Sequence, residues 1–274
     1  MSKIKALIFD QDGVIIDTER DGHRMAFNQT FEEFGYDFEW GVEKYHELLQ
    51  VSGGKERMRH YLHTEGFGVE VKPEEEDALI KSMHKKKTET FIGLIESGKL
   101  PLRPGVKRLM QEAIDAGLTL GVCTTSNERA AQAVAYGILK DLKFDFVLAG
   151  DVVSKKKPDP EIYNLALQKT GLKPEECIVV EDSRNGVLAA SAAGMHIVAT
   201  TNIYTASENL DEAHIIVTCL GDPGGKKGEL KKGGEGIDYD GVLRLGQLIE
   251  YFSLAKKRSV ALEQRRLRVA PSGG

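Results

Sequence analysis

Cysteine is scarce in this chain of 274 residues. Its three cysteines, at positions 123, 177 and 219, are too few and too widely spaced for a disulfide framework or a paired-cysteine metal site. This scarcity favours a reducing compartment. No apolar run reaches the roughly 18 residues that a membrane span needs, so we expect no membrane partner. The first residues, MSKIKALIFD, pass directly into a strand-like run, so we expect no signal peptide there.

Positive charge is not in excess either. Lysine and arginine number 37 against 42 aspartates and glutamates, which gives a formal net charge of −5. Because general nucleic-acid binding requires a basic face, we expect no nucleic-acid partner. Hydrophobic residues make up 41% and charged residues 29%, a balance typical of globular proteins. The length allows one large domain or two small ones.

Short apolar runs recur along the chain and alternate with helical patterns. The runs that suit buried strands are residues 4–9, 118–123, 177–180 and 195–200, with a weaker one at 144–149. The helical patterns between them cover residues 105–116, 128–136, 160–170 and 185–193. This alternation predicts an α/β fold with a doubly wound, Rossmann-like parallel sheet.

A long helical interval separates the first strand from the rest of the sheet. Residues 18–98 contain only helical patterns, and Pro101 and Pro104 mark the return to strand-like sequence. We therefore expect an α/β core domain formed by residues 1–17 and 99–220, with an inserted α-helical cap domain at residues 18–98.

The C-terminal part, residues 221–274, has a different composition. Residues 221–241 hold eight glycines among lysines, which favours a flexible loop, and the apolar periodicity of residues 243–254 suits a docked helix. Residues 256–268 carry six basic residues and one acid. This tail is either a solvated end or a basic contact segment.

Polar side chains gather where the predicted strands end. In open parallel sheets, ligands bind outside the carboxyl ends of the strands. The run at 4–9 is followed by Asp10-Gln11-Asp12-Gly13, and the run at 118–123 by Thr124-Thr125-Ser126-Asn127. The run at 177–180 is followed by Glu181-Asp182. Lys157, which precedes Pro158 and a helical pattern, adds an ammonium group.

Carboxylates crowded at one edge repel one another, so a hard cation with oxygen ligands, Mg²⁺, is expected there. Cation, ammonium and hydroxyl groups together suit phosphoryl transfer, in which charge spreads over the phosphoryl oxygens. Asp10 can then act as the nucleophile and Asp12 as the general acid and base. Taken singly, each motif has a structural alternative: a capped turn, a helix N-cap, a solvated lysine or a helix-dipole contact. The ordered set of all four favours catalysis.

The order of these motifs resembles that of the haloacid dehalogenase-like hydrolase superfamily over residues 4–220. Motif one is Asp10-Gln11-Asp12-Gly13-Val14, and Thr124, Lys157 before Pro158, and Glu181-Asp182 follow it. The resemblance implies Mg²⁺ as cofactor, held by Asp10, by the main-chain carbonyl of Asp12, by Asp182, and by Glu181 directly or through water. It also implies an aspartyl-phosphate on Asp10, acid–base catalysis by Asp12, and contacts of Thr124 and Lys157 with the phosphoryl group.

Within that superfamily, the chain is similar to the CbbY branch of xylulose-1,5-bisphosphate phosphatases. The segments that carry this similarity are residues 18–24, 52–58, 103–106, 124–127 and 155–163. The similarity implies hydrolysis of xylulose 1,5-bisphosphate, an inhibitory by-product of Rubisco, to xylulose 5-phosphate and phosphate. The link to Rubisco would run through this inhibitor, without direct contact. The implied compartment is the chloroplast stroma in a plant or alga, and the cytoplasm otherwise.

A sugar bisphosphate needs a second anion site. Residues 53–57, Gly-Gly-Lys-Glu-Arg, open a helical pattern, where free backbone N–H groups favour phosphate; an ordinary turn before a solvated helix is the alternative. The candidates in this segment are Gly54, Lys55 and Arg57. The candidates for sugar hydroxyls are Asp17, Glu19 and His23, of which His23 suits a structural histidine equally well. The substrate-binding candidates beside Thr124 are Thr125, Ser126 and Asn127.

Two other functions stay open. A sugar phosphomutase of the β-phosphoglucomutase type would use the same residues and return the phosphoryl group to a sugar. A non-catalytic binding protein of this fold would lack the nucleophile or a metal ligand, yet Asp10, Asp12 and Asp182 are all present. We expect a monomer. Residues 221–274 carry a net charge of +4 and residues 1–220 one of −9, so an anion would need focused positive charge in a pocket.

Overall fold

The computed structural model describes residues 3–51, 53–98 and 100–253, which form two compact units. Of these described residues, the first unit contains those up to 15, those in 102–126 and those from 141 onwards. The second unit contains the described residues in 16–101 and 127–140. Each unit has its own buried core.

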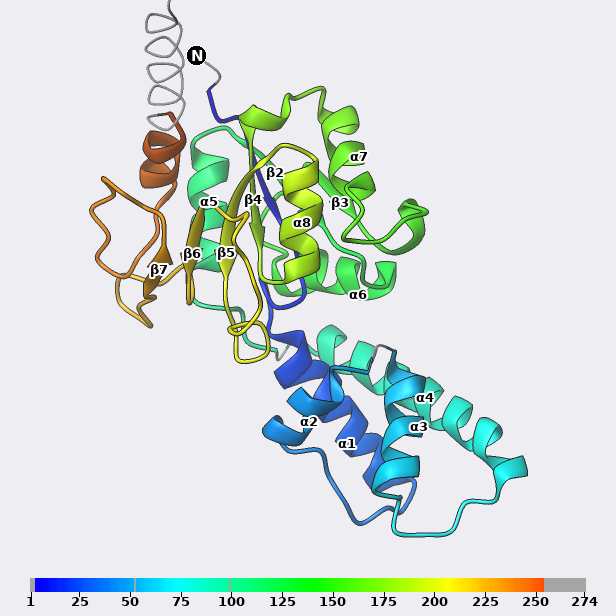
Figure 1. The fold of residues 1–274 in the computed structure, drawn as a ribbon. Coiled ribbons are helices and arrows are strands. Elements are labelled where there is room, and N and C mark those ends of the chain that lie inside the picture. Colours follow the sequence, from blue (N-terminus) through cyan, green and yellow to red (C-terminus); the bar gives the residue numbers. More distant parts are fainter. Residues whose placement is uncertain (1–2, 52, 99, 254–274) are drawn as a thin grey trace, which may run out of the picture. The chain divides into compact units, whose positions relative to one another are not determined.

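A seven-stranded sheet forms the centre of the first unit (Figure 1). Its strands lie in the order β3-β2-β1-β4-β5-β6-β7, and all neighbours are parallel except β6 and β7. In chain order the strands are β1 (Ala6–Phe9), β2 (Thr119–Cys123), β3 (Phe146–Leu148), β4 (Cys177–Glu181), β5 (His196–Thr200), β6 (Ile215–Val217) and β7 (Leu230–Lys232).

The central strands are buried on both faces, as their continuous apolar runs predict. Every residue of β1 and β4 is buried. Between β1 and β5 the helices of this unit are α5 (Val106–Asp115), α7 (Glu161–Thr170) and α8 (Arg184–Ala192), with 3-10 turns at Gly150–Val152 and Pro174–Glu176. Residues of α7 and α8 pack with alternate residues of the central strands, and α5 contacts β1 and β2. The predicted doubly wound α/β sheet is confirmed.

Two strands at one edge of the sheet were not part of the sequence prediction. β6 and β7 are three residues each, too short to give an alternation or a distinct apolar run. β7 pairs antiparallel with β6 and lies within residues 221–241. The flexible loop that composition predicts for this segment therefore needs correction, because part of it is a strand of the sheet.

The segment around β7 is also held to α5. The Arg108 guanidinium donates hydrogen bonds to the carbonyl oxygens of Leu220 (3.1 Å), Gly221 (2.8 Å) and Leu243 (3.0 Å). Residues 245–253 are helical, and Leu245, Leu248 and Phe252 are buried there. The basic stretch at 256–268 lies outside the described residues.

The second unit is helical. Its elements are a π-helical turn at Thr18–His23, α1 (Arg24–Glu33), α2 (Val42–Leu48), α3 (Gly54–Thr64), α4 (Pro73–Glu96), α6 (Glu128–Gln132) and a π-helical stretch at Ala133–Ile138. The single pattern predicted at 128–136 is thus divided into two helical pieces. Phe27, Phe31 and Trp40 form the aromatic centre, with ring centroids 4.8 Å apart for each pair with Trp40. Among the described helices, α4 included, none combines the length and apolar character needed to cross a bilayer.

Candidate active site

Asp10 stands directly after β1, in the middle of the sheet. Its backbone N–H donates to the carbonyl oxygen of Val180, 2.9 Å away, which extends the pairing of β1 with β4 by one residue. Because Phe9 pairs with Val180 in the register, Asp10 and Glu181 come opposite each other. The strand order reverses between β1 and β4. In doubly wound sheets, ligands bind at the carboxyl ends of the strands at this point.

Lys157 connects the two carboxylates. Its ammonium group lies 2.6 Å from Asp10 Oδ1 and 2.6 Å from Glu181 Oε1, and it donates to the carbonyl oxygen of Cys123 at 3.1 Å. The Lys157 side chain is 7% exposed, whereas that of Lys155 in the same run is 72% exposed. The third lysine of this run is therefore the buried member of an ion-pair network.

Glu181 is the most enclosed of the acids. It accepts hydrogen bonds from Lys157 and the Tyr163 hydroxyl at Oε1, and from the backbone N–H of Asp182 at Oε2 (3.2 Å). Gly186, in the first turn of α8, makes room for it, since a Cβ there would lie about 2 Å from the carboxylate. Tyr163 was not among the predicted site residues, because a tyrosine inside an apolar helical pattern gives no signal of a polar contact.

Asp182 completes a cluster of three buried carboxylates. Oxygen atoms of Asp10, Glu181 and Asp182 all lie within 4.8 Å of one another. Asn202, which follows β5, donates from its amide to Asp182 Oδ2 at 2.8 Å. Gly13 has φ +78°, and a Cβ there would lie 2.0 Å from the same oxygen, so both the turn and the space require glycine.

The protonation of this cluster is governed by burial. Burial raises the pKa of Asp10, although the Lys157 ammonium opposes the shift. Burial, with the Asp10 and Glu181 carboxylates, raises the pKa of Asp182 well above its ordinary value. Burial also opposes charge on Lys157, but the two carboxylates raise its pKa, so it stays an ammonium. One ammonium cannot compensate three ionised carboxylates, so either protons or a further cation must do so, and an oxygen-ligated divalent cation fits this donor set.

Asp12 receives a hydrogen bond from the Ser126 hydroxyl at Oδ2. Its other oxygen, Oδ1, is buried without a hydrogen-bond partner. Thr124 is 1% exposed, and its hydroxyl accepts from the backbone N–H of Ser126 at 3.1 Å. The structure thus brings Ser126 to the candidate acid and base, whereas the sequence placed it only among substrate-binding residues.

The residues beside Thr124 differ in exposure and in their hydrogen bonds. Thr125 is half-buried. Asn127 is exposed, and its side chain accepts from the backbone N–H of Arg129 at 2.9 Å, which caps the start of α6. The helix N-cap considered for Thr124 is therefore supplied by Asn127.

Three polar residues of the second unit form a hydrogen-bonded chain. The Tyr45 hydroxyl donates to Glu19 Oε2 at 2.6 Å, and Arg57 Nη1 donates to the Tyr45 oxygen at 3.2 Å. Arg57 Nε also donates to the carbonyl oxygen of Leu48 at 3.0 Å, and the residue is 8% exposed. Arg57 is thus a buried cation, while Lys55 in the first turn of α3 is exposed.

His23 is paired with a lysine that the sequence did not single out. Lys87 Nζ lies 2.7 Å from His23 Nδ1 and 4.7 Å from the ring centroid of Phe27. His23 stacks on Phe91 with ring centroids 3.8 Å apart. Burial, and then the nearby Lys87 and Arg57 cations, lower the pKa of His23 well below its ordinary value, so its ring is neutral and accepts from Lys87.

A signal for Lys87 does exist in the sequence. The buried stripe of α4 includes Ile80, Met83, Lys87 and Phe91, at the i, i+3 and i+4 spacings of one helix face. A lysine in such a stripe is buried unless it reaches around its neighbours. Asp17, the remaining candidate for sugar hydroxyls, caps the π-helical turn by accepting from the backbone N–H of Arg20 at 3.4 Å.

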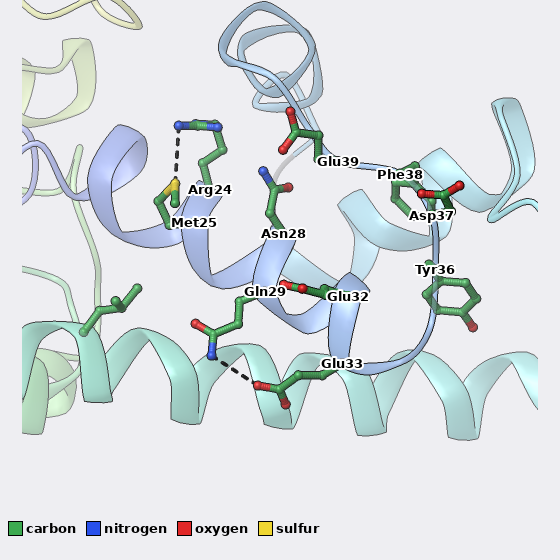
Figure 2. A pocket seen from close by; sticks show the side chains of 11 residues that line it. Arg24, Met25, Asn28, Gln29, Glu32, Glu33, Tyr36, Asp37, Phe38 and Glu39 are labelled. Atoms are coloured by element: carbon green, nitrogen blue, oxygen red, sulfur yellow. Dashed lines mark hydrogen bonds between the residues drawn. The ribbon is translucent and has the colours of Figure 1, made fainter.

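A groove of about 1040 Å³ lies along α1 and the loop that follows it. Figure 2 shows that carboxylates line it, and the acidic residues among its lining are Glu32, Glu33, Asp37 and Glu39. The Gln29 amide donates to Glu33 across one wall at 3.2 Å. Four carboxylates against the one guanidinium of Arg24 make this groove a poor site for a phosphate.

Comparison with known proteins gives consistent matches. A family model described as haloacid dehalogenase-like hydrolase matches residues 4–194. A CBBY-like protein of Arabidopsis thaliana is 47% identical over 222 residues, which are 80% of this chain and 70% of that protein. A mutant of CbbY from Rhodobacter sphaeroides in complex with xylulose-(1,5)bisphosphate has a TM-score of 0.64 at 37% identity, over 81% of this chain and 97% of that one. A putative β-phosphoglucomutase from Thermotoga maritima has a TM-score of 0.59 at 27% identity, over 75% and 89%.

Proposed function

Since the chain belongs to the haloacid dehalogenase-like hydrolases, and within them to the CbbY group, we propose that it is a Mg²⁺-dependent sugar-bisphosphate phosphatase. Its proposed substrate is xylulose 1,5-bisphosphate, and the products are xylulose 5-phosphate and inorganic phosphate. The observation that carries this proposal is the ammonium of Lys157 between Asp10 and Glu181 at the carboxyl end of β1. The complex of the Rhodobacter sphaeroides protein with xylulose-(1,5)bisphosphate supports the choice of substrate.

Mg²⁺ is proposed to be held by Asp10, by Asp12 through its main-chain carbonyl, by Asp182, and by Glu181 directly or through water. When bound, the ion would neutralise the carboxylates and stabilise negative charge on the phosphoryl oxygens. The buried cluster of Asp10, Glu181 and Asp182 supports this assignment. Burial disfavours the charged form of Asp10 and Asp182, so their ionisation calls for a nearby cation.

The chain's own residues then divide the reaction into two steps. A carboxylate oxygen of Asp10 attacks phosphorus while the bond from phosphorus to the sugar oxygen breaks, and Asp12 gives that oxygen a proton. Water, losing a proton to Asp12, then attacks the aspartyl-phosphate, which releases phosphate and restores Asp10. Lys157 compensates charge on Asp10 and the phosphoryl group, and Ser126 orients Asp12 through its hydrogen bond. Thr124 is proposed to donate to the phosphoryl oxygens.

The test is phosphate release from a panel of substrates with Mg²⁺. The panel contains xylulose 1,5-bisphosphate, ribulose 1,5-bisphosphate, fructose 1,6-bisphosphate and glucose 1-phosphate. We expect the highest kcat/KM on xylulose 1,5-bisphosphate. Asp10→Asn should lower kcat by several orders of magnitude while thermal unfolding stays cooperative, as for loss of a covalent nucleophile. Asp115→Asn, on the exposed end of α5, is the matched control. Near wild-type activity of Asp10→Asn would overturn the aspartyl-phosphate mechanism.

A phosphomutase is the second candidate, because the chain is also similar in structure to a putative β-phosphoglucomutase. The two reactions share the first step and differ in what receives the phosphoryl group. A single turnover with labelled phosphate separates them, since only the phosphatase releases all of the label as inorganic phosphate.

The cations of the second unit are proposed to select the second phosphate of the substrate. Arg57 and Lys87 are buried near aromatic rings, where a charge is weakly screened, and Lys55 opens α3 together with Gly54. Glu19 accepts from the Tyr45 hydroxyl that Arg57 also contacts, and His23 accepts from Lys87. Both are proposed to bind sugar hydroxyls. A link to Rubisco through its inhibitor, and a plastid location in a plant or alga, follow from the proposed substrate.

A further inference from the structure

The side chain of Asn202 reaches the carboxylate cluster from the loop after β5. Its Nδ2 lies 2.8 Å from Asp182 Oδ2. Neither the motifs of the sequence nor the strand ends on which they lie included this residue. Asn202 lies 20 positions after Asp182, outside the four segments that carry the motifs.

Local hydrogen bonds decide which end of the Asn202 amide faces the acid. Oδ1 accepts from the backbone N–H groups of Tyr204 (2.9 Å) and Thr205 (3.1 Å). The Thr205 hydroxyl in turn accepts from the backbone N–H of Asn202 at 3.2 Å. Because the oxygen is taken up by two donors, the NH₂ group is the end that points at Asp182.

The backbone on both sides of this contact is fixed by one guanidinium. Arg103 Nη2 donates to the carbonyl oxygen of Thr201, the neighbour of Asn202, at 2.6 Å. Its Nη1 donates to the carbonyl oxygen of Gly13 and to the Thr200 hydroxyl, the latter at 2.8 Å. Gly13 borders the same oxygen of Asp182. The Asp182 carboxylate is therefore held between two loops that Arg103 ties together.

We propose that Asn202 is a positioning residue for the metal site. Its amide holds Oδ2 of Asp182 and leaves Oδ1 as the oxygen offered to Mg²⁺. This inference rests on the proposed function, because it assigns Asp182 to the metal. Outer hydrogen bonds of this kind orient ligating carboxylates, and their loss typically weakens metal binding about 10- to 100-fold.

Titration calorimetry of the full chain with Mg²⁺ tests the proposal. Asn202→Ser keeps an oxygen that can accept from the following backbone N–H groups, but it is too short to reach Asp182. Asn202→Ala removes both interactions. The matched control is Asn209→Ala, an exposed asparagine whose side chain accepts from the backbone N–H of Asp211 at 2.9 Å and has no contact with the cluster. We expect the Kd for Mg²⁺ to rise about tenfold or more in both Asn202 variants and to stay unchanged in the control.

The outcomes separate this proposal from the one it rests on. If the wild type shows no Mg²⁺ binding, the proposed function fails. If the wild type binds Mg²⁺ and Asn202→Ser binds it equally tightly, the positioning role fails while the proposed function stands. A purely structural role would lower the melting temperature of Asn202→Ser without metal and leave its Kd for Mg²⁺ unchanged. The positioning role also requires that kcat recover at saturating Mg²⁺.

Discussion

Two lysines show how a single residue is selected from a run. Lys157 and Lys87 are each the third lysine of three in a row, and each is buried beside a titratable partner. For Lys157 the following Pro158 and the order of the motifs gave the signal. For Lys87 the signal is its place in the apolar stripe of α4.

The buried acids of the cluster make metal-free stability depend on pH. Burial raises the pKa of Asp182 in the folded state, so the folded protein binds more protons than the unfolded chain above the ordinary pKa of an aspartate. Stability from this group is therefore highest at acidic pH. It is lost as pH rises from about 4, the unfolded value, through the raised folded pKa.

Asp182→Asn removes the free-energy cost of ionising a buried carboxyl group and keeps an oxygen that accepts from Asn202. In EDTA at neutral pH, we expect the variant to melt several degrees above the wild type, since each pKa unit corresponds to about 1.4 kcal/mol. The difference should disappear near pH 4, and Mg²⁺ should stabilise the wild type more than the variant. Melting curves across this pH range, with Asp115→Asn as control, provide the measurement. Equal melting temperatures at neutral pH would contradict the assigned penalty.

At the scale of elements, the segment after β6 depends on α5 for its order. Besides the carbonyl oxygens that Arg108 holds, Asp222 accepts from the backbone N–H of Gly105 at 2.8 Å, and Glu112 accepts from that of Leu245 at 2.8 Å. Glycine-rich composition indicates flexibility only when nothing outside the segment binds its backbone. Here a helix that lies 112 to 135 positions earlier in the chain supplies the partners.

Arg108→Met keeps the packing of the aliphatic stem and removes the donors. We expect a loss of at least roughly 2 kcal/mol in the free energy of unfolding, because one hydrogen bond from a charged group is worth about 1.5–3 kcal/mol and Arg108 donates several. Limited proteolysis within residues 221–243 should become faster. Lys107→Met, which breaks an exposed ion pair with Asp141, should change stability by less than about 1 kcal/mol. Equal proteolysis of both variants would show that Arg108 does not hold the segment.

At the scale of the whole molecule, the proposed function assigns substrate selection and chemistry to different units. The first unit carries the carboxylate cluster with Lys157, and the second carries Arg57 and Lys87. Because residues 1–220 carry a net charge of −9, the proposal requires local cations such as these to favour a doubly phosphorylated sugar.

Lys87→Met tests this division, since methionine fills a similar volume between Phe27 and Phe91. We expect kcat/KM for xylulose 1,5-bisphosphate to fall about 10- to 100-fold, in line with the loss of one charge-assisted hydrogen bond. Hydrolysis of 4-nitrophenyl phosphate, which has no second phosphate, should change little. Lys85→Met, with a side chain 81% exposed in the same run, is the control. An equal loss on both substrates would contradict a role in selection.

The sequence by itself determined the alternation of β1 to β5 with helices, a helical interval after the first strand, and the residues at the ends of β1, β2 and β4. These are local patterns, since an apolar run and the polar residue that ends it lie within a few positions of each other. The sheet register then decided which groups meet. Tyr163 with Glu181, Ser126 with Asp12, and Asn202 with Asp182 are joined across 18, 114 and 20 positions.

Such contacts have no local signature, because each residue type also occurs at ordinary caps, turns and helix faces. Only the tertiary structure decided them, by bringing the ends of parallel strands to one edge and excluding water from the groups that meet there.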